Sequence, residues 1–218
     1  MLRLMQKNSF YFLFYALVWI PIFILAVVLP GRPLDTGMVF FEGMWIILIL
    51  LGSTITCEQN ESKTRGYDFL KTLPVKDSQI VKAKFSLVFL TACFVSVYVS
   101  VIYLFVSKPP NVFAFALIFI PLCVFVGLLL TALLYILIFK IGLSKAIKIG
   151  WIAFFGVVIG TILFIEFVLV KSDINSEKMS AFIQSIPLVI WISSGLGFLV
   201  GYFLLMSVAI KAKEKARG

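Results

Sequence analysis

The sequence of 218 residues contains no histidine, and this absence excludes a wide range of catalytic chemistry. Zinc hydrolase motifs, histidine-assisted nucleophiles and haem ligation through an imidazole all require that side chain. A phosphate-binding loop of the form G-x-x-x-x-G-K-[ST] is missing as well. We therefore expect that the chain is not an enzyme, that it holds no metal, and that it binds no nucleotide through such a loop.

Charged residues are scarce, since they make up 13% of the sequence while 62% of it is hydrophobic. This composition lies outside the range of soluble globular domains. Within the long apolar stretches the acidic residues are limited to Glu42 and Glu166, which belong to different stretches. Two isolated carboxylates give little support for an acid–base catalytic site, so transport or scaffolding is favoured over catalysis.

Long apolar runs are what the sequence has in abundance. A membrane-spanning helix needs about 20 predominantly apolar residues, and six stretches meet this length. They are residues 9–29, 37–57, 85–107, 112–139, 149–170 and 186–210. Too few residues remain for a separate soluble domain, so residues 1–218 are expected to form a single transmembrane domain. The predicted fold class is all-α, a polytopic membrane protein with six transmembrane helices.

Lysine and arginine are distributed unevenly among the segments that flank these stretches. Fifteen of the nineteen lie in the amino terminus, the second and fourth connections and the carboxyl terminus, and four lie in the other connections. Because cytoplasmic segments of membrane proteins carry the excess of positive charge, both termini are predicted to be cytoplasmic. The formal net charge of +9 then requires no nucleic acid partner.

The longest polar segment is the connection 58–84 between the second and third stretches. Pro74 divides it into two helical patterns, because proline cannot continue a helix. The first pattern is an apolar stripe of four side chains at helical spacing: Tyr67, Phe69, Leu70 and Leu73. The second pattern can be capped by Asp77 or Ser78, and it is expected to run directly into the third stretch.

A short amphipathic helix beneath a membrane has two interpretations. It can rest its apolar stripe on the lipid surface. Alternatively, it can insert that stripe into a groove of a soluble partner as a docking helix. The pattern alone leaves both interpretations open.

The order of features in this connection resembles that in the membrane subunits of type-2 ABC exporters. The shared features are glutamates after the second stretch, a glycine, spaced leucines, a proline followed by a small apolar residue, and a lysine directly before the third stretch. In this sequence they are Glu58, Glu61, Gly66, Leu70, Leu73, Pro74, Val75 and Lys84. The six-helix layout is shared too, so the resemblance covers most of the chain.

The resemblance implies a permease subunit that forms half of a pore, pairs with a second permease as a homodimer or heterodimer, and couples to two separate ATP-binding subunits. ATP and magnesium would be bound by those ATPase partners, and this chain would hold no cofactor. The connection 58–84 would supply the first short amphipathic coupling helix on the cytoplasmic side. Its contact residues would be Tyr67, Phe69, Leu70, Leu73 and Pro74. Gly142 and Ser144, in the connection 140–148, would make the second contact, although this connection also suits a plain basic loop.

Glu42 and Glu166 are predicted to share a depth near the outer face of the membrane. In the resembling family the second and fifth helices line the translocation path, which would let both carboxylates face a cationic or amphipathic cargo. The alternative is that each carboxylate reaches the headgroup water, with Glu166 pairing locally with Lys171. Together with the apolar interior, these two carboxylates favour export of a hydrophobic or amphipathic cargo. Peptides are one candidate, and lipids, small drugs and ions are the others.

Gly156 and Gly160 form a G-x-x-x-G pattern in the fifth stretch. Such a face lets two helix backbones approach closely. One interpretation places these glycines at the interface with the second permease. The other is packing within the subunit.

The leading interpretation is thus the permease of an ATP-driven exporter in a plasma membrane. Fifteen lysines against four arginines are typical of AT-rich bacterial genomes, so a bacterial cell is expected. One alternative is the solute-binding membrane subunit of a vitamin-type uptake system. Another is a membrane scaffold that transports nothing.

Overall fold

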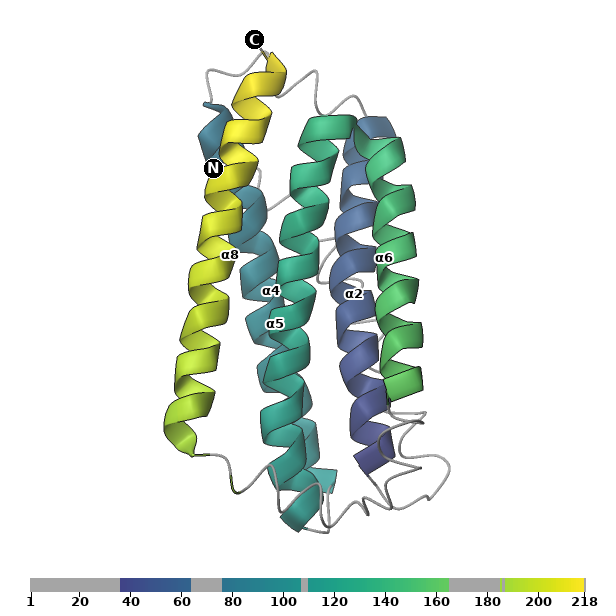
Figure 1. Ribbon diagram of the computed structural model, residues 1–218, viewed down its shortest axis with the longest axis vertical. Coiled ribbons are helices and arrows are strands. Elements are labelled where there is room, and N and C mark those ends of the chain that lie inside the picture. The colour runs from purple at the N-terminus through teal and green to yellow at the C-terminus, as the bar shows by residue number, and fades with distance from the viewer. Residues whose placement is uncertain (1–35, 64–75, 107–109, 165–184, 186, 218) are drawn as a thin grey trace.

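The computed structural model describes residues 36–63, 76–106, 110–164, 185 and 187–217, and within these ranges it contains five helices and no strand (Figure 1). The helices are α2 (Thr36–Lys63), α4 (Asp77–Val106), α5 (Pro110–Ile141), α6 (Leu143–Phe164) and α8 (Leu188–Arg217). The predicted all-α class is confirmed for this part of the chain. The first predicted span lies outside the described residues.

Each of the other five predicted spans corresponds to one helix, but several helices extend past the predicted limits. α2 continues to Lys63, although its apolar run ends at residue 57, and α8 continues to Arg217, although its run ends at residue 210. α4 begins at Asp77, as the capping pattern predicts. Hydropathy identifies the part of a helix that lipid can cover, so polar turns that continue the same helix carry no such signal.

Three of the described helices are long and apolar enough to cross a membrane. Their membrane-compatible segments are Asp77–Val99 of α4, Phe119–Ile141 of α5 and Ser193–Lys215 of α8, each 23 residues long. At about 1.5 Å per residue, each segment exceeds the roughly 30 Å thickness of a bilayer core. The total of six spans and the orientation of the termini remain predictions.

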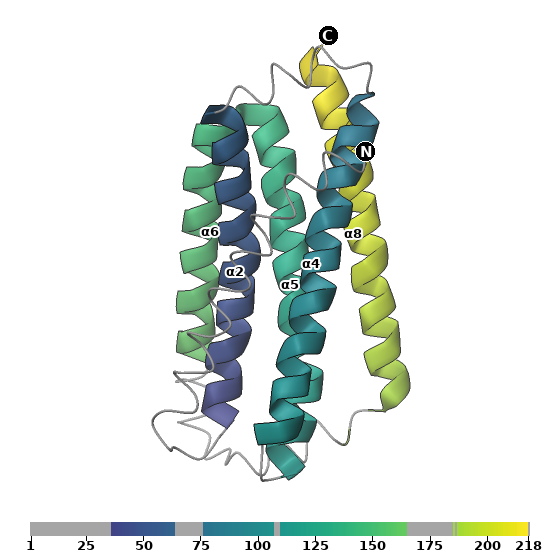
Figure 2. The same cartoon turned by 180° about the vertical axis from the view of Figure 1, so that it is seen from behind.

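α5 is the central helix of the described bundle, because it contacts α2, α4, α6 and α8. Figures 1 and 2 show α2 and α6 side by side on one flank of α5, and α4 and α8 side by side on the other. The sequence of α5 is apolar around its whole circumference, as expected for a helix surrounded by other helices.

Close packing of α2 against α5 depends on glycine at two positions. A Cβ atom at Gly43 would lie 2.6 Å from Cε1 of Phe119 and would also overlap Sγ of Cys123. At Gly127 of α5, a Cβ atom would lie 2.8 Å from a methyl group of Leu50. Both distances are shorter than van der Waals contact, so the two helices can be this close only because these residues lack side chains.

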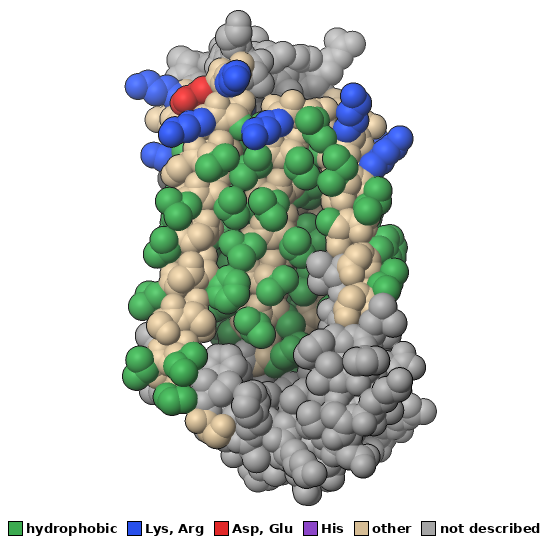
Figure 3. Space-filling view, viewed as in Figure 1, with side chains coloured by type: hydrophobic (Ala, Val, Ile, Leu, Met, Phe, Trp, Pro, Cys, Tyr) green, Lys and Arg blue, Asp and Glu red, His purple; other side chains and the backbone are tan. Residues whose placement is uncertain are grey.

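The outer surface of the bundle is apolar along most of its length. Large exposed apolar side chains project from α4 at Leu90, Phe94, Val97 and Val101, from α6 at Ile152, Phe155 and Ile159, and from α8 at Leu196, Val200, Phe203 and Leu204. Figure 3 shows apolar side chains spread over the helices on one face of the molecule. A soluble protein rarely exposes so large an apolar surface, whereas a membrane protein covers it with lipid or with other membrane helices.

The described lysines gather at one end of the bundle, which we call the lysine-rich end. It is the end where α2 finishes, α4 begins, α5 meets α6 and α8 finishes, and Figure 3 shows the positive charges there. The lysines are Lys63, Lys76, Lys82, Lys84, Lys140, Lys145, Lys148, Lys211, Lys213 and Lys215. The segments that the sequence shows to be rich in lysine thus lie together at one end of the described bundle.

The glycine contact between α2 and α5 gives a stability prediction. Gly43→Val should lower the free energy of unfolding by about 1–3 kcal/mol, because the added methyl groups overpack the contact with Phe119 and Cys123. Gly52→Val is the matched control on the same helix, since a Cβ atom there meets nothing within 4 Å. Thermal unfolding in detergent micelles measures both effects. Equal melting temperatures for the two variants would contradict this account of the packing.

Candidate functional site

Three charged side chains are buried together at the lysine-rich end. Glu58 and Glu61 of α2 are 0% and 6% exposed, and Lys84 of α4 is 2% exposed. The Lys84 ammonium donates a hydrogen bond to Oε1 of Glu58 and another, 2.7 Å long, to Oε2 of Glu61. We call this group the Lys84 triad. Its members stabilise one another, because a buried charge without a partner costs several kcal/mol.

The local sequence explains how two carboxylates reach one ammonium. Residues three positions apart on a helix lie on the same face, so Glu58 and Glu61 project from α2 in the same direction. Lys84 lies about two turns into α4, between Ala83 and Phe85, both buried. The triad therefore joins α2 to α4 through side chains alone.

Aromatic side chains beside Lys84 connect two further helices to α4. The Lys84 ammonium lies 5.8 Å from the ring centroid of Tyr135 of α5, within cation–π range. The ring of Phe85 lies 5.5 Å from that of Tyr135 and 5.2 Å from that of Tyr202. Tyr202 of α8 also donates its hydroxyl hydrogen to the Phe85 carbonyl oxygen at 2.8 Å. α5 and α8 are thus held against α4 beside the triad.

A second contact joins α8 to the beginning of α4. Nζ of Lys213 lies 4.0 Å from Oδ1 of Asp77, and both side chains are mostly buried. The same ammonium lies 5.2 Å from the ring centroid of Phe139 of α5. Lys213 belongs to the turns of α8 that extend past its predicted end. We call the five charged residues Glu58, Glu61, Asp77, Lys84 and Lys213 the charged junction.

The charged junction lies at both ends of the segment 64–75. Glu61 precedes the end of α2 by two residues, and Asp77 is the first residue of α4. The predicted coupling residues Tyr67, Phe69, Leu70, Leu73 and Pro74 all belong to this segment. They lie outside the described residues, so their role stays a prediction.

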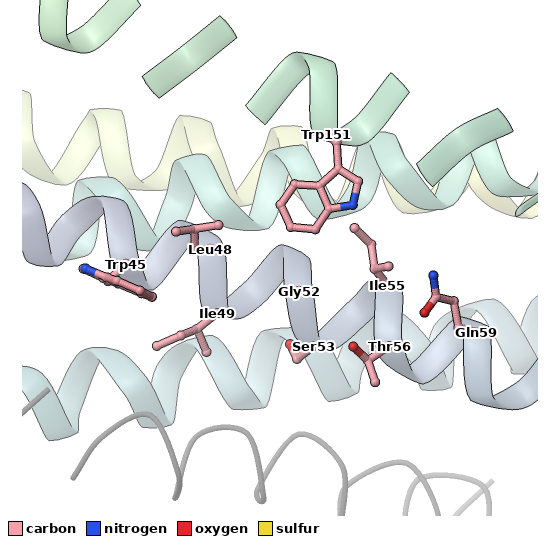
Figure 4. A pocket seen from close by; sticks show the side chains of 9 residues that line it. All are labelled: Trp45, Leu48, Ile49, Gly52, Ser53, Ile55, Thr56, Gln59 and Trp151. Carbon is pink, nitrogen blue, oxygen red and sulfur yellow. The ribbon is translucent and has the colours of Figure 1, made fainter. Parts of the chain in front are cut away.

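A pocket of about 400 Å³ lies along α2. Eight of its lining residues come from that helix, and Trp151 comes from α6: Trp45, Leu48, Ile49, Gly52, Ser53, Ile55, Thr56, Gln59 and Trp151. From Trp45 to Gln59 the helix rises about 21 Å at about 1.5 Å per residue, so the pocket is elongated along the bundle. Figure 4 shows the Trp151 ring pointing from α6 toward α2.

The chemical lining of this pocket is mixed. Two indole rings and aliphatic side chains supply an apolar wall, while Ser53, Thr56 and Gln59 supply polar groups toward the lysine-rich end. A Cβ atom on Gly52 would meet nothing within 4 Å, so this glycine leaves space inside the pocket. Such a lining suits a ligand that is apolar along one part and polar along another.

A comparison with protein families decides the assignment. The family model described as ABC-2 family transporter protein matches residues 2–213. The chain belongs to this family. Neither the curated proteins nor the solved structures give a match to the chain. The resemblance drawn from the connection 58–84 is confirmed, and this ABC-2 family member is a membrane permease component of an ABC transporter.

The predicted path residues of this ABC-2 permease are only partly covered by the structure. Glu42 is the seventh residue of α2, which begins at Thr36, and the position of its side chain is not described. Glu166 lies outside the described residues. The proposal that both carboxylates face one path therefore stays a prediction.

Gly142 and Ser144, predicted for the second coupling contact, lie where α5 meets α6. Instead of a connection over residues 140–148, Gly142 alone separates the two helices. Its φ of +86° is a conformation that favours glycine, and its N–H donates to the Ile138 carbonyl oxygen at 3.1 Å. Ser144 is exposed in the first turn of α6. The turn is present, and the contact with an ATPase stays a prediction.

Gly156 and Gly160 lie on an exposed face of α6, and a Cβ atom at either position would meet nothing within 4 Å. Among the described residues, they therefore pack against no other helix of this chain. Their predicted place at an interface with a second permease is open to test. In α8, by contrast, a Cβ atom at Gly201 would lie 3.8 Å from Leu129 of α5.

Sequence reasoning missed two features of this permease. Glu58, Glu61 and Lys84 entered the analysis as marks of a family resemblance, and their pairing was not predicted. A signal was present, because two acids at helical spacing after one span precede a lysine at the start of the next. The pocket was also missed, although Gly52 and Thr56 place small residues four positions apart on α2.

The Lys84 triad predicts different stabilities for two variants, one that removes only the ammonium and one that removes all three charges. Lys84→Met should lower the free energy of unfolding by about 3–5 kcal/mol, because it removes the ammonium that both buried carboxylates contact. The triple variant Glu58→Met, Glu61→Met, Lys84→Met should unfold close to wild type, because buried ion pairs can be replaced by apolar groups of similar volume at little cost.

Thermal unfolding in detergent micelles distinguishes the two variants. Lys82→Met is the matched control, because Lys82 is exposed on the same helix two residues away and should leave the melting temperature unchanged. A triple variant that is as unstable as Lys84→Met would contradict the mutual neutralisation of the triad.

Proposed function

We propose that this chain is the membrane-spanning permease subunit of an ATP-driven exporter in a bacterial plasma membrane. It pairs with a second permease, and two ATPase subunits that bind ATP and magnesium dock on its cytoplasmic side. Both termini and the segment 64–75 face the cytoplasm. The cargo is hydrophobic or amphipathic.

The charged junction is the observation that carries this proposal. The chain has no phosphate-binding loop, so the energy of ATP must enter it through a contact with another protein. A contact can move membrane helices only if the contacted segment is firmly joined to them. The helix ends that flank residues 64–75 meet this condition, because Glu61 near the end of α2 and Asp77 at the start of α4 both contact buried or half-buried lysines.

The orientation rests on the lysine-rich end. The excess of lysine and arginine in cytoplasmic segments places this end of the bundle inside the cell. The apolar stripe of Tyr67, Phe69, Leu70 and Leu73 would then lie on the side where soluble ATPases are available. Insertion of an amphipathic helix into a groove of such a partner suits this arrangement.

The pocket along α2 supports the cargo class. It lies between the second and fifth predicted spans, which the family resemblance assigns to the translocation path. Its wall combines Trp45 and Trp151 with the polar side chains Ser53, Thr56 and Gln59. An amphipathic cargo can place its apolar part against the indole rings and its polar part near the lysine-rich end.

The outward face of α6 supports pairing with a second permease. Gly156 and Gly160 leave open space beside exposed apolar side chains of the same helix. A second membrane helix could approach closely at this face.

A binding experiment tests the contact with the ATPase. Leu70→Asp and Phe69→Asp should each reduce copurification of an ATPase from membranes at least tenfold, because a carboxylate cannot be buried in an apolar groove without cost. Gln79→Asp is the control, since it adds the same charge at an exposed position in the first turn of α4. Copurification is measured by affinity capture in mild detergent followed by mass spectrometry.

Two results would contradict the proposal. Equal ATPase recovery from wild type and from both aspartate variants would show that the stripe is not the docking surface. A tightly bound small metabolite in a chain that captures no ATPase would favour the solute-binding subunit of an uptake system.

The pocket gives a second test, with a synthetic amphipathic peptide of leucine and lysine as the probe. Binding should change the tryptophan fluorescence of the purified permease, because Trp45 and Trp151 line the pocket. Gly52→Phe should weaken peptide binding at least tenfold, because the ring fills the space beside Ser53. Gly197→Phe on α8 is the control and should leave binding unchanged, because Gly197 is exposed and does not line the pocket. Equal binding by both variants would contradict the assignment of the pocket to cargo.

A further inference from the structure

The two sides of α6 have different surroundings. One side packs inside the bundle, since Ala146 and Phe154 are buried and a Cβ atom on Gly150 would lie 3.0 Å from Leu134 of α5. The opposite side is exposed, and we call it the exposed α6 face. Its residues recur every three or four positions, as one face of a helix requires. They are Lys145, Lys148, Ile149, Ile152, Phe155, Gly156, Ile159 and Gly160.

The chemistry of the exposed α6 face changes along the helix axis. At the lysine-rich end it carries Lys145 and Lys148, and Lys140 is exposed in the last turn of α5. Ile152 and Phe155, which are 72% and 55% exposed, lie about 6 Å and about 10 Å beyond Lys148 along the axis. Half of a bilayer core is about 15 Å thick. When the lysines lie at the headgroups, these apolar side chains therefore lie among the acyl chains of the same leaflet.

The positive charge of these three lysines is not neutralised within the described part of the chain. None of them forms an ion pair with a described carboxylate, because the ion pairs at this end use the lysines of the charged junction. The exposed lysines of α8 differ, since the exposed Glu214 lies between Lys211 and Lys215. The exposed α6 face thus combines unneutralised positive charge with adjoining apolar surface.

We propose that the exposed α6 face binds an anionic phospholipid, whose phosphate contacts Lys145 and Lys148 and whose acyl chain lies along Ile149, Ile152 and Phe155. The ammonium groups donate charge-assisted hydrogen bonds to the phosphate oxygens. A zwitterionic lipid offers the same acyl chain, but its own cation opposes the lysines. The inference does not depend on the proposed function, because it needs neither an ATPase nor a cargo.

A second copy of the chain alone is less suited to this face. Two copies in one membrane have the same orientation, so a symmetric pair in contact here would place the lysines of one copy opposite those of the other. Like charges at such short range repel one another. An anionic headgroup between the two copies would neutralise both sets of lysines, so the lipid is compatible with a pair of permeases.

Photolabelling tests where the lipid binds. The probes are phosphatidylglycerol with a diazirine in its acyl chain and phosphatidylcholine with the same group. The purified permease, in nanodiscs of unlabelled phosphatidylcholine, is irradiated with each probe and analysed by mass spectrometry after digestion. The anionic probe should label residues 149–155 at least fivefold more strongly than the zwitterionic probe, because each lysine near the lipid surface favours an anionic headgroup. Both probes should label the exposed residues Leu90 and Val97 of α4 equally.

Charge variants test the role of the two lysines. Lys145→Gln with Lys148→Gln should abolish the preference for the anionic probe at residues 149–155, whereas Lys145→Arg with Lys148→Arg should keep it, because arginine also binds phosphate. Lys211→Gln with Lys215→Gln is the matched control, since it removes the same charge at the same end from another helix, and it should leave the labelling of α6 unchanged. All four lysines are exposed, so equal melting temperatures are expected throughout.

Three results would overturn the inference. Equal labelling of residues 149–155 by the two probes in wild type would show that the lysines attract no anionic lipid. An equal loss of preference in the glutamine variants of α6 and α8 would show that charge acts diffusely over the whole lysine-rich end. An absence of label from residues 149–155 would show that another protein helix covers this face in place of lipid.

Discussion

The buried contact of one ammonium with two carboxylates is the interaction on which this structure depends. Burial of Glu58 and Glu61 at the end of α2 requires a cation in contact with their carboxylates. Lys84 supplies it, and this fixes α4 beside α2. The rings of Tyr135 and Tyr202 then hold α5 and α8 to the same point. A polar contact thus organises one end of a bundle whose described helices pack mostly through apolar side chains.

This arrangement separates two tasks within one small membrane protein. At the lysine-rich end, charges and aromatic rings bind four helices firmly together. Farther along α2, Gly52 and the polar side chains near it leave a pocket against Trp151 of α6. The proposed function needs both features, because the proposed ATPase would act on one part and the other would change shape in response.

Sequence reasoning predicted the helices better than it predicted their contacts. Runs of apolar residues located all five described helices, and Asp77 marked the start of α4, because lipid burial and helix capping are local properties of the chain. The ends of α2 and α8 were placed too early, because Glu61 and Lys213 are polar and only their distant partners, Lys84 and Asp77, explain their burial. The pocket depends on how α6 packs against α2, which no local pattern specifies.

The most direct test of the account is a structure of the complex purified from membranes, determined by electron cryomicroscopy with ATP and vanadate bound. The account predicts an ATPase in contact with the segment 64–75, with Lys84 still paired to Glu58 and Glu61. An ATPase docked elsewhere on the permease, or a triad whose charges have separated in the trapped state, would contradict it.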